Sequence, residues 1–372
     1  MKTSDFDYDL PPERIAQHPA PTRDGSRLLA LDRRTGAVRH LAFRDLPSLL
    51  GEGDLLVAND TRVMPARLFA TVAAAPQAGA PPVTGAREVE VLLLREEPGV
   101  APERVWTALA RPAKALREGA TLAFVDPGYA GVVIGTGERG IRHVAFRPAG
   151  AVPAAGAAPA FEAWLSRVGH VPLPPYIRRA DEPGDRERYQ TVFARETGSV
   201  AAPTAGLHFT DALLDEIRAR GARVATVTLH VGPGTFRPVA TEDPADHVLD
   251  PEPYRVPAET VAALETVAAP ARTAGPRGRV IAVGTTCVRA LESWARDGRP
   301  KDGAWRETGL FILPPYDFKV VQGMVTNFHL PRSSLLMLVS ALAGRERLLA
   351  AYAEAVRAGY RFYSYGDAML VV

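Results

Sequence analysis

The stretch from residue 279 to residue 292, RVIAVGTTCVRALE, combines an apolar strand, a Gly-Thr-Thr turn and the opening of a helix. Helix and strand also alternate before it: Thr210 is placed to cap a helix that ends at Gly221, and the β-branched run 224–230 follows. This alternation, which starts at residue 161, predicts an α/β domain. Further strands are expected at 28–32, 55–58, 279–283, 308–312 and 319–326, and further helices at 261–269, 287–296, 334–343 and 345–358.

The pattern changes after Pro65, where six short β-rich runs alternate with Gly, Pro or charged turns. Such spacing is typical of an antiparallel barrel or sandwich. The sequence therefore predicts a small β domain at 66–150, inserted into a discontinuous α/β domain that consists of 1–65 and 151–372. The expected strands of the β domain are 68–72, 89–94, 104–110, 121–125, 131–134 and 141–146.

The composition is that of a soluble globular protein with two domains. The chain has 372 residues, of which 47% are hydrophobic and 23% charged, and roughly 150 residues make a domain. Its formal net charge of +2 excludes a global field that would drive it onto nucleic acid or an anionic membrane. Ala, Pro and Gly dominate the stretches 73–85 and 148–160, which have too little bulk to pack a core and are expected to be a loop and a linker.

Several classes of protein are disfavoured by what the sequence lacks. The single cysteine, Cys287, excludes an intramolecular disulfide and a CxxC metal cluster. No secretory signal is visible before residues 5–9, and the longest aliphatic run, 335–342, is too short to span a bilayer, so a cytoplasmic protein without membrane contact is expected. HExxH and GxSxG patterns are absent, which argues against metal catalysis and against a serine hydrolase; no metal is expected.

The Gly284-Thr285-Thr286 turn is the first candidate site. Free backbone N–H groups and the positive end of a helix dipole attract a carboxylate or phosphate, and the two hydroxyls add donors. The turn matches neither the P-loop pattern nor the GxGxxG fingerprint. An ordinary strand-to-helix connection explains the segment equally well, and Cys287 at its end is more typical of a packed small side chain than of a nucleophile.

Other polar residues gather where predicted strands end, which is where ligands bind in α/β sheets. Paired glycines let a backbone approach a ligand closely, and a histidine ahead of a helix in a small-residue loop favours a functional role. Tight turns without a ligand are the alternative for these segments. The candidates are Asp60, Thr61 and Arg62 after the strand at 55–58; Thr204, Gly206 and His208 in the loop 199–210; His230, Gly232, Gly234 and Thr235; and Asn327 and His329.

Two further segments carry groups that suit RNA. Tyr365 lies in an aromatic run beside Arg361, and such a run can stack on an unpaired base, although core packing is the ordinary interpretation. The loop 178–188 contains Arg178 and Arg179 among acidic residues that cancel their charge. A solvated loop is the ordinary interpretation, and presentation of arginines to phosphates is the alternative.

Taken together, these segments resemble one family, S-adenosylmethionine:tRNA ribosyltransferase-isomerase, which acts in queuosine biosynthesis. The resemblance extends from Phe6 to Leu370 and its blocks are long. In the pattern of this family, Cys287 stands where Ser is common and Asp250 where His is frequent, so neither residue is expected to have an obligatory catalytic role. The blocks are LLVANDTRVMPARL, YQTVFARETGSVAAPTAGLHFT, VTLHVGPGTFRPV, AVGTTCVRALES, TNFHLPRSSLLMLVSALAG and YRFYSYGDAML.

The resemblance implies a fold, a reaction and substrates. The fold is a discontinuous α/β sandwich domain with an inserted β-barrel. The enzyme would move the ribosyl unit of S-adenosylmethionine onto 7-aminomethyl-7-deazaguanine at the tRNA wobble position, giving epoxyqueuosine in tRNA, adenine and methionine. S-adenosylmethionine is then a co-substrate, no tightly bound cofactor is needed, and a monomer is expected.

The chemistry of this reaction assigns expected roles. A sulfonium acidifies the hydrogens on C5′, so a general base can start the reaction, after which ring opening expels adenine and the amine attacks as methionine leaves. His208 and His230 are expected to transfer protons because imidazole titrates near neutral pH. The expected substrate-binding residues are Asp60, Thr61, Arg62, Thr204, Gly206, Gly232, Gly234, Thr235, Gly284, Thr285, Thr286, Arg289, Asn327, His329 and Tyr365, and the expected tRNA-binding residues are Arg178 and Arg179.

Two other classes of function stay open at this point. A conventional methyltransferase would also bind S-adenosylmethionine, but it would release S-adenosylhomocysteine rather than adenine. A non-catalytic RNA-binding protein would bind tRNA and leave the donor unchanged.

Overall fold

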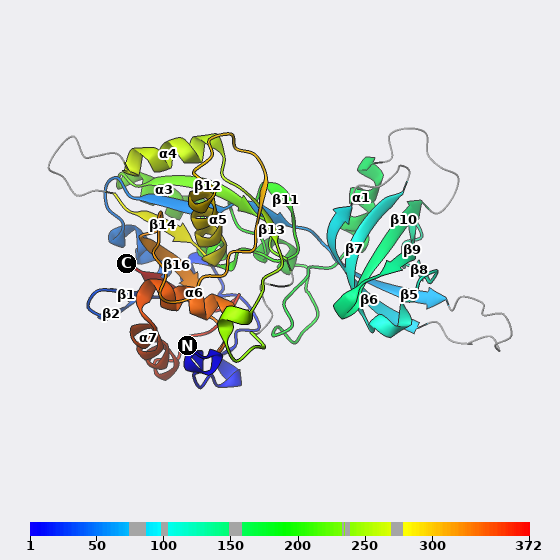
Figure 1. Ribbon diagram of the computed structural model, residues 1–372, viewed down its shortest axis with the longest axis horizontal. Coiled ribbons are helices and arrows are strands. Elements are labelled where there is room, and N and C mark those ends of the chain that lie inside the picture. Colours follow the sequence, from blue (N-terminus) through cyan, green and yellow to red (C-terminus); the bar gives the residue numbers. More distant parts are fainter. Residues whose placement is uncertain (74–86, 98–102, 149–157, 233, 235–238, 269–277) are drawn as a thin grey trace. The chain divides into compact units, whose positions relative to one another are not determined.

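A computed structural model describes residues 1–73, 87–97, 103–148, 158–232, 234, 239–268 and 278–372. The chain forms two compact units, each drawn in Figure 1. The larger unit consists of Met1–Arg62, Pro174–Ala180 and Glu187–Val372, and the smaller unit consists of Val63–Leu173 and Asp181–Arg186. Both units are therefore assembled from separate stretches of the chain.

Nine strands form one sheet in the larger unit. They are β1 (Arg27–Leu31), β2 (Val38–Ala42), β3 (Leu55–Asn59), β12 (Arg223–Leu229), β13 (Glu252–Arg255), β14 (Val280–Val283), β15 (Arg306–Thr308), β16 (Gly323–Asn327) and β17 (Ala368–Val371). Their order is β15-β13-β12-β3-β14-β16-β17-β1-β2. The neighbours β12, β3, β14 and β16 run parallel. Every residue of β3, β14 and β16 is buried, as expected where both faces of a parallel sheet are covered.

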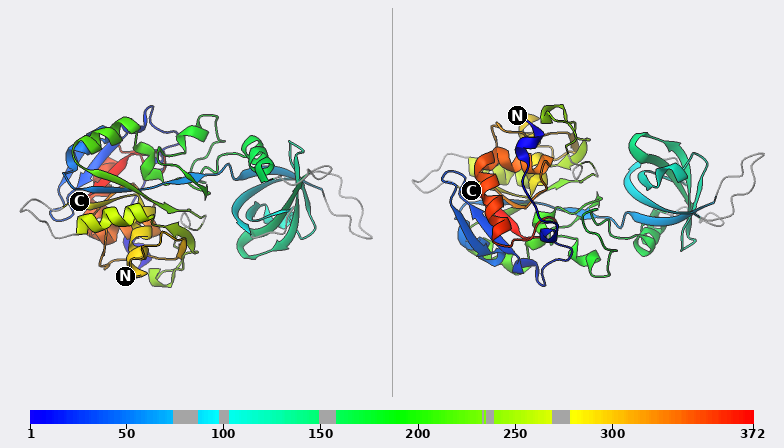
Figure 2. Two further views of the ribbon diagram at one scale, coloured as in Figure 1. Left: turned by 90° about the horizontal axis from the view of Figure 1, so that it is seen from above. Right: turned by 90° about the horizontal axis from the view of Figure 1, so that it is seen from below.

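Helices cover both faces of this sheet, as Figures 1 and 2 show. On one face, Leu213 and Ile217 pack in the core that contains Leu56 of β3. The other core contains Val57 of β3 together with apolar residues of four helices. Leu56 and Val57 are successive residues, so alternate side chains of one strand enter opposite cores. The helices are α3 (Asp211–Ala219) on the first face and α4 (Ala258–Ala268), α5 (Thr285–Arg296), α6 (Ser334–Ala343) and α7 (Arg345–Arg357) on the second.

Local sequence determines where these helices begin. Thr210 caps α3, as predicted, because its Oγ1 accepts a hydrogen bond from the N–H of Leu213 at 3.2 Å. Ser333 caps α6 in the same way. The residue before α5 is Gly284, whose φ of 91° lies in the left-handed region that favours glycine. Its N–H donates to the carbonyl of Val325 at 2.7 Å, which places the start of α5 beside β16.

Two predicted strands are partly wrong. The strand expected at 308–312 ends at residue 308, and the carbonyls of Thr308 and Leu310 accept from the Arg289 side chain instead. The strand expected at 319–326 begins only at Gly323. In the preceding residues, the backbone N–H groups of 319, 320 and 321 donate to the Glu292 carboxylate at 2.9 to 3.0 Å. Both differences arise from side chains of α5, which take backbone groups that a sheet would use.

The smaller unit is a closed antiparallel barrel, which confirms the prediction of a β-barrel domain. Its strands are β5 (Arg67–Ala73), β6 (Arg87–Glu97), β7 (Arg104–Arg111), β8 (Thr121–Ala123), β9 (Tyr129–Thr136) and β10 (Ile141–Pro148). They close in the order β10-β7-β6-β5-β8-β9. Buried residues alternate along β6 and β7, which is the period expected when one face of a strand fills a barrel.

The smaller unit extends past the expected limit of residue 150. Helix α1 (Ala158–Val168) belongs to it because aromatic residues of the helix pack on the barrel. The ring centroids of Phe161 and Phe146 are 5.3 Å apart, and those of Trp164 and Phe124 are 5.1 Å apart. Residues 158–160 are thus helical rather than linker. The remainder of the expected linker and most of the expected loop, 149–157 and 74–85, lie outside the described residues.

Four further short elements matter for the site. The strand β4 (Thr61–Val63) pairs with the strand β11 (Glu196–Ser199), and the other two elements are the helix α2 (Asp185–Arg188) and the 3-10 helix η7 (Thr204–His208). Among the helices of the described residues, none has the length and apolarity required to cross a membrane.

Candidate functional site

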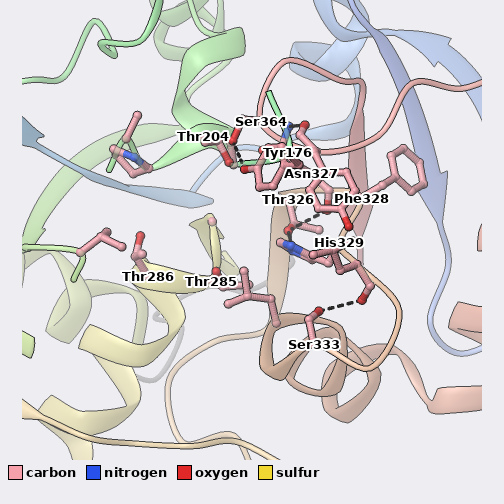
Figure 3. A pocket seen from close by; sticks show the side chains of 18 of the residues that line it. Tyr176, Thr204, Thr285, Thr286, Thr326, Asn327, Phe328, His329, Ser333 and Ser364 are labelled. Carbon is pink, nitrogen blue, oxygen red and sulfur yellow. Dashed lines mark hydrogen bonds between the residues drawn. The ribbon is translucent and has the colours of Figure 1, made fainter. Parts of the chain in front are cut away.

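A pocket of the larger unit opens at the carboxyl ends of β14 and β16 (Figure 3). It contains about 770 Å³ of space, open solvent included. Ligands of open α/β sheets bind at this edge. Its described lining comes from residues 202–205, Val231 after β12, the first turn of α5, the end of β16 with the segment that follows it to residue 335, the pair Tyr363 and Ser364, and Tyr176.

The first turn of α5 presents polar groups to the pocket. Gly284, Thr285 and Thr286 all line it. The first backbone hydrogen bond of the helix is donated by the N–H of Val288 to Gly284 at 3.3 Å, so the preceding amides have no partner inside the helix. Together with the helix dipole, these amides favour a negatively charged group such as a carboxylate.

Asn327 lines the same pocket and has an unpartnered acceptor. Its Nδ2 donates to the carbonyl of Tyr363 at 3.2 Å and to Nε2 of His208 at 3.1 Å. These partners orient the carboxamide, because the opposite orientation would put Oδ1 against a carbonyl oxygen. Oδ1 is buried and has no hydrogen-bond partner among the described residues. A buried acceptor of this kind calls for a donor, which a ligand or an ordered water can supply.

His329 also lines the pocket, and its surroundings hold it in place. Its Nε2 lies 2.7 Å from Oγ1 of Thr326. Its backbone N–H donates to the hydroxyl of Tyr352 at 3.0 Å, and its carbonyl accepts from the hydroxyl of Tyr8. Burial lowers the pKa of His329 to about 3, so the ring is neutral at physiological pH.

His208 lies behind Asn327 and is absent from the described lining. Its Nδ1 is 2.7 Å from Oγ of Ser26, its Nε2 accepts from Asn327, and its ring stacks on Phe43 with centroids 5.0 Å apart. Burial lowers its pKa to about 3, and the charge of Arg361 adds to this effect. Both ring nitrogens are therefore engaged with protein groups.

His230 belongs to a second polar cluster. Its Nδ1 is 2.7 Å from Oγ1 of Thr61, and its ring stacks on Trp305 with centroids 5.0 Å apart. The guanidinium of Arg255 lies over the ring of Trp305, 5.1 Å from its centroid, and forms an ion pair with Glu196 at 2.8 Å. Burial lowers the pKa of His230 to about 4. This cluster does not contribute to the described lining of the pocket.

Two neighbours of Thr61 differ in exposure. Asp60 is buried and accepts from the hydroxyl of Thr228 at 2.7 Å, and burial raises its pKa. Arg62 is exposed and donates to the carbonyl of Ala194 at 3.1 Å. The structure thus brings Thr61 to His230 and leaves Arg62 at the surface.

Most of the remaining candidates are absent from the described lining of the pocket. Thr204 lines the pocket. Gly206 is buried, and the side chain of Thr191 occupies the space that a Cβ at residue 206 would need. Gly232 donates to Oε1 of Glu252 at 2.7 Å. Arg289, which was expected to bind substrate, forms a buried ion pair with Glu252. Gly234 lies close to the Asp250 carboxylate, and Thr235 lies outside the described residues.

The residues expected to contact RNA have different surroundings. Tyr365 is buried, and its ring meets that of Tyr189 edge to face at 5.9 Å. Arg179 donates to the carbonyls of Gln17 and Ala180 at 3.0 and 2.9 Å. Arg178 has an exposed side chain, and its backbone N–H donates to Oε1 of Gln17 at 2.8 Å.

Sequence reasoning missed several lining residues. Tyr176 and Ser364 share a hydrogen bond of 2.6 Å across 188 positions of the chain, and no local pattern indicates that they meet. Thr326 and Ser333 lie in the segment that contains Asn327 and His329, so the polar run itself was the available signal. None of the described lining residues has a carboxylate, ammonium or guanidinium group, and the described part of the chain contains no cluster of three His, Cys, Asp or Glu side chains suited to a metal ion.

The whole chain is similar to proteins of one family. Residues 3–371 match the family described as queuosine biosynthesis protein. The S-adenosylmethionine:tRNA ribosyltransferase-isomerase of Citrifermentans bemidjiense is 49% identical over 371 residues, and that of Geobacter metallireducens is 50% identical over 372, with all of each chain covered. The crystal structure of S-adenosylmethionine tRNA ribosyltransferase from Thermotoga maritima superposes with a TM-score of 0.51 at 37% identity, covering 99% of this chain and 100% of that one.

Proposed function

The chain belongs to the queuosine biosynthesis protein family, and on this premise we propose that the pocket at the ends of β14 and β16 binds S-adenosylmethionine as the ribosyl donor. The chain is an enzyme of the ribosyltransferase-isomerase type and acts on tRNA. Its acceptor is proposed to be 7-aminomethyl-7-deazaguanine at the wobble position. The products are then epoxyqueuosine in tRNA, adenine and methionine, made by a monomeric enzyme in the cytoplasm without a bound metal.

One observation supports this placement above the others: a single pocket contains both a helix N-terminus and an unpartnered buried acceptor. The first turn of α5 suits the carboxylate of the methionine part. Oδ1 of Asn327 suits a hydroxyl or amino group of the adenosine part, because it is buried without a donor among the described residues. S-adenosylmethionine has both kinds of group, so one ligand satisfies both ends.

The reaction needs a general base, a proton donor for the departing adenine, and polar groups that hold the ribose hydroxyls. A base removes a hydrogen from C5′ beside the sulfonium, and the ribose ring opens as the bond to adenine breaks. The aminomethyl group of the tRNA base then attacks the opened unit, and the bond to sulfur breaks to release methionine. The methyl group stays on sulfur throughout, which distinguishes the reaction from methyl transfer.

His208 and His230 have proposed roles that follow from their contacts. We assign His208 the positioning of Asn327, because its Nε2 accepts from the Asn327 amide and the ring does not line the pocket. His230 lies with Trp305 and Arg255, both of which can stack on a nucleobase. We therefore propose that His230 contacts the acceptor base of the tRNA rather than S-adenosylmethionine.

Product analysis tests the reaction. The purified protein is incubated with S-adenosylmethionine and tRNA that carries the aminomethyl-deazaguanine, and the products are separated by chromatography. Adenine and methionine in equal amounts, with a mass gain on the wobble base, support ribosyl transfer. S-adenosylhomocysteine indicates methyl transfer, and tRNA binding without turnover indicates a non-catalytic protein; either result rejects the proposal.

A substitution tests the location of the donor. Thr285→Val keeps the side-chain shape but removes a hydroxyl from the pocket. Loss of a hydrogen bond to a charged group costs about 1.5–3 kcal/mol, so the Kd for S-adenosylmethionine should rise by about tenfold or more. Thr266→Val, at an exposed position on α4, is the matched control. Calorimetry that gives the same Kd for both variants would place the donor elsewhere.

A further inference from the structure

One described lining residue of the pocket carries an imidazole, the side chain that most often acts as a general acid or base in enzymes. Among its described lining residues, the polar side chains are hydroxyls, the Asn327 amide and the imidazole of His329. Hydroxyls and amides are too weak to act as bases without an activating partner. His329 is therefore the described lining residue best suited to removing a hydrogen from carbon.

Hydrogen bonds around Thr326 indicate which nitrogen of His329 carries the hydrogen. The hydroxyl of Thr326 donates to the carbonyl of Asn327 at 3.2 Å, and a hydroxyl has only one hydrogen to give. With the hydroxyl hydrogen assigned to that carbonyl, Oγ1 of Thr326 accepts from Nε2–H of His329 across a distance of 2.7 Å. In a neutral imidazole the other nitrogen has a lone pair, so Nδ1 is the basic atom. No described residue forms a hydrogen bond with Nδ1.

The backbone of His329 is held on both sides by tyrosine hydroxyls. Tyr352 accepts from its N–H and Tyr8 donates to its carbonyl. The two tyrosine rings meet edge to face with centroids 5.2 Å apart, and Phe328 packs on Tyr352 at the same distance. Such support keeps a reacting side chain in one position, which proton transfer to a bound substrate requires.

We propose that Nδ1 of His329 is the general base that removes a hydrogen from C5′ of bound S-adenosylmethionine, with Thr326 as its positioning residue. The inference rests on the proposed function. In this step the C5′–H bond breaks, the proton forms a bond to Nδ1, and the electron pair stays on C5′ beside the positive sulfur. The sulfonium becomes a neutral ylide while the imidazole becomes an imidazolium, so total charge is conserved.

Burial has two effects on this role, because the low pKa that keeps the ring neutral also makes the imidazole a weaker base. It keeps the ring of His329 neutral, and only a neutral imidazole can accept a proton. His208 is equally neutral, but both of its nitrogens are bound to Ser26 and Asn327. His230 lies in the second polar cluster, where its ring stacks on Trp305, and it is outside the described pocket lining.

Release of tritium from C5′ measures the proposed step directly. His329→Asn is compared with wild type and with His40→Asn, a substitution of a partly exposed histidine on β2 that pairs with Glu354. Donor tritiated at C5′ is mixed with substrate tRNA, and tritium in water is counted during a single turnover. We expect His329→Asn to slow release by about 10²–10⁴-fold, the usual contribution of a general base. Its Kd for S-adenosylmethionine should stay close to that of wild type, and His40→Asn should behave as wild type.

A kinetic isotope effect separates catalysis from structure. With donor deuterated at C5′, the effect on turnover should increase in His329→Asn because hydrogen removal becomes fully rate-limiting. Free imidazole should restore part of the activity of His329→Gly. A purely structural role predicts weaker donor binding, an unchanged isotope effect and no rescue, and that result would overturn the proposal.

Substitutions of Thr326 keep the proposal testable if the His329 variants do not fold. Thr326→Val removes the acceptor of Nε2–H while preserving shape, so the ring is no longer held with its lone pair at Nδ1 and tritium release should slow. Thr326→Ser retains the hydroxyl and should restore the rate. Equal rates in the two variants would reject the positioning role. A wild-type enzyme that releases no adenine would instead reject the proposed function itself.

Discussion

Nδ2 of Asn327 donates to Nε2 of His208 at 3.1 Å, across 119 positions of the chain. Because Nε2 accepts, the hydrogen of the neutral imidazole is on Nδ1, which lies 2.7 Å from Oγ of Ser26. Ser26, His208 and Asn327 thus form a chain of hydrogen bonds that ends at the pocket. Asn327 is the last residue of this chain, and its Oδ1 has no partner among the described residues.

Replacing His208 should weaken donor binding more than it slows chemistry. His208→Leu removes the acceptor that orients Asn327, so the amide loses a hydrogen bond and the free energy of unfolding should fall by about 1–3 kcal/mol. We expect KM for S-adenosylmethionine to rise clearly and kcat to change less. His208→Gln keeps a side-chain acceptor and should retain more affinity. Steady-state kinetics would contradict this positioning role if the leucine variant kept the wild-type KM but lost kcat.

Acid should destabilise the protein through its buried histidines. Burial lowers the pKa to about 3 for His208 and His329 and to about 4 for His230, whereas histidine in an unfolded chain titrates near 6.5. Between these values the unfolded state binds more protons than the native state, so stability is full above about pH 6.5 and falls as pH decreases towards 3. Each histidine contributes a slope of up to about 1.4 kcal/mol per pH unit in this window.

Urea unfolding of wild type and His208→Leu at several pH values between 7 and 4 measures this effect. The variant is less stable at pH 7 but should lose stability less steeply on acidification, because one proton no longer binds to its unfolded state. Parallel slopes for the two proteins would show that His208 is protonated in the native state as well.

The Arg289–Glu252 ion pair should be essential for stability rather than for substrate binding. Both side chains are almost fully buried, and Arg289 also donates to the carbonyls of Leu310 and Thr308 at 3.0 and 3.2 Å. Arg289→Met leaves a buried carboxylate without its cation, which costs about 3–5 kcal/mol. The double variant Arg289→Met, Glu252→Gln should recover part of the loss. Thermal unfolding measures both, and a stable double variant unable to bind S-adenosylmethionine would instead make Arg289 a ligand of the substrate.

Local sequence signals were sufficient for most of the fold. The cap at Thr210 and the terminating Gly221 delimit α3 from adjacent residues alone, and alternation along 89–94 and 104–110 indicates strands with one buried face. The failure at 319–322 has a non-local cause. Glu292 accepts the backbone N–H groups of these residues, and a side chain 27 positions earlier in the sequence leaves no pattern in the segment itself.

For the site as well, local sequence signals identified some residues, whereas tertiary contacts decided the surroundings of others. Thr285, Asn327 and His329 could be chosen because polar residues at strand ends converge at one edge of a parallel sheet. The choice of His208 rested on the intrinsic pKa of imidazole, but its burial and its contacts to Ser26 and Asn327 depend on tertiary packing. Tyr176 belongs to the segment Pro174–Ala180, which is part of the larger unit although the residues before and after it belong to the smaller unit. No local pattern predicts that the chain returns to the larger unit for this short segment.

Arg178 should contribute one phosphate contact to tRNA binding, and Arg179 should contribute mainly to structure. The side chain of Arg178 is exposed and has no hydrogen bond to another described residue, whereas Arg179 fastens its segment to the carbonyl of Gln17. Neutralising one phosphate contact changes the slope of log K against log salt by roughly 0.7–0.9. Arg178→Ala should therefore weaken tRNA binding at low salt and flatten its salt dependence by about that amount, with S-adenosylmethionine affinity unchanged.

Filter binding across a salt series distinguishes Arg178 from an arbitrary surface arginine. Arg357→Ala, at an exposed position near the end of α7, is the matched control and should leave the slope as in wild type. Arg179→Ala should lower the unfolding temperature, because the guanidinium no longer holds Gln17. If Arg178→Ala and Arg357→Ala gave the same affinity and slope as wild type, the 178–188 loop would be a solvated surface, and the tRNA phosphates would have to be bound by other cations of the chain.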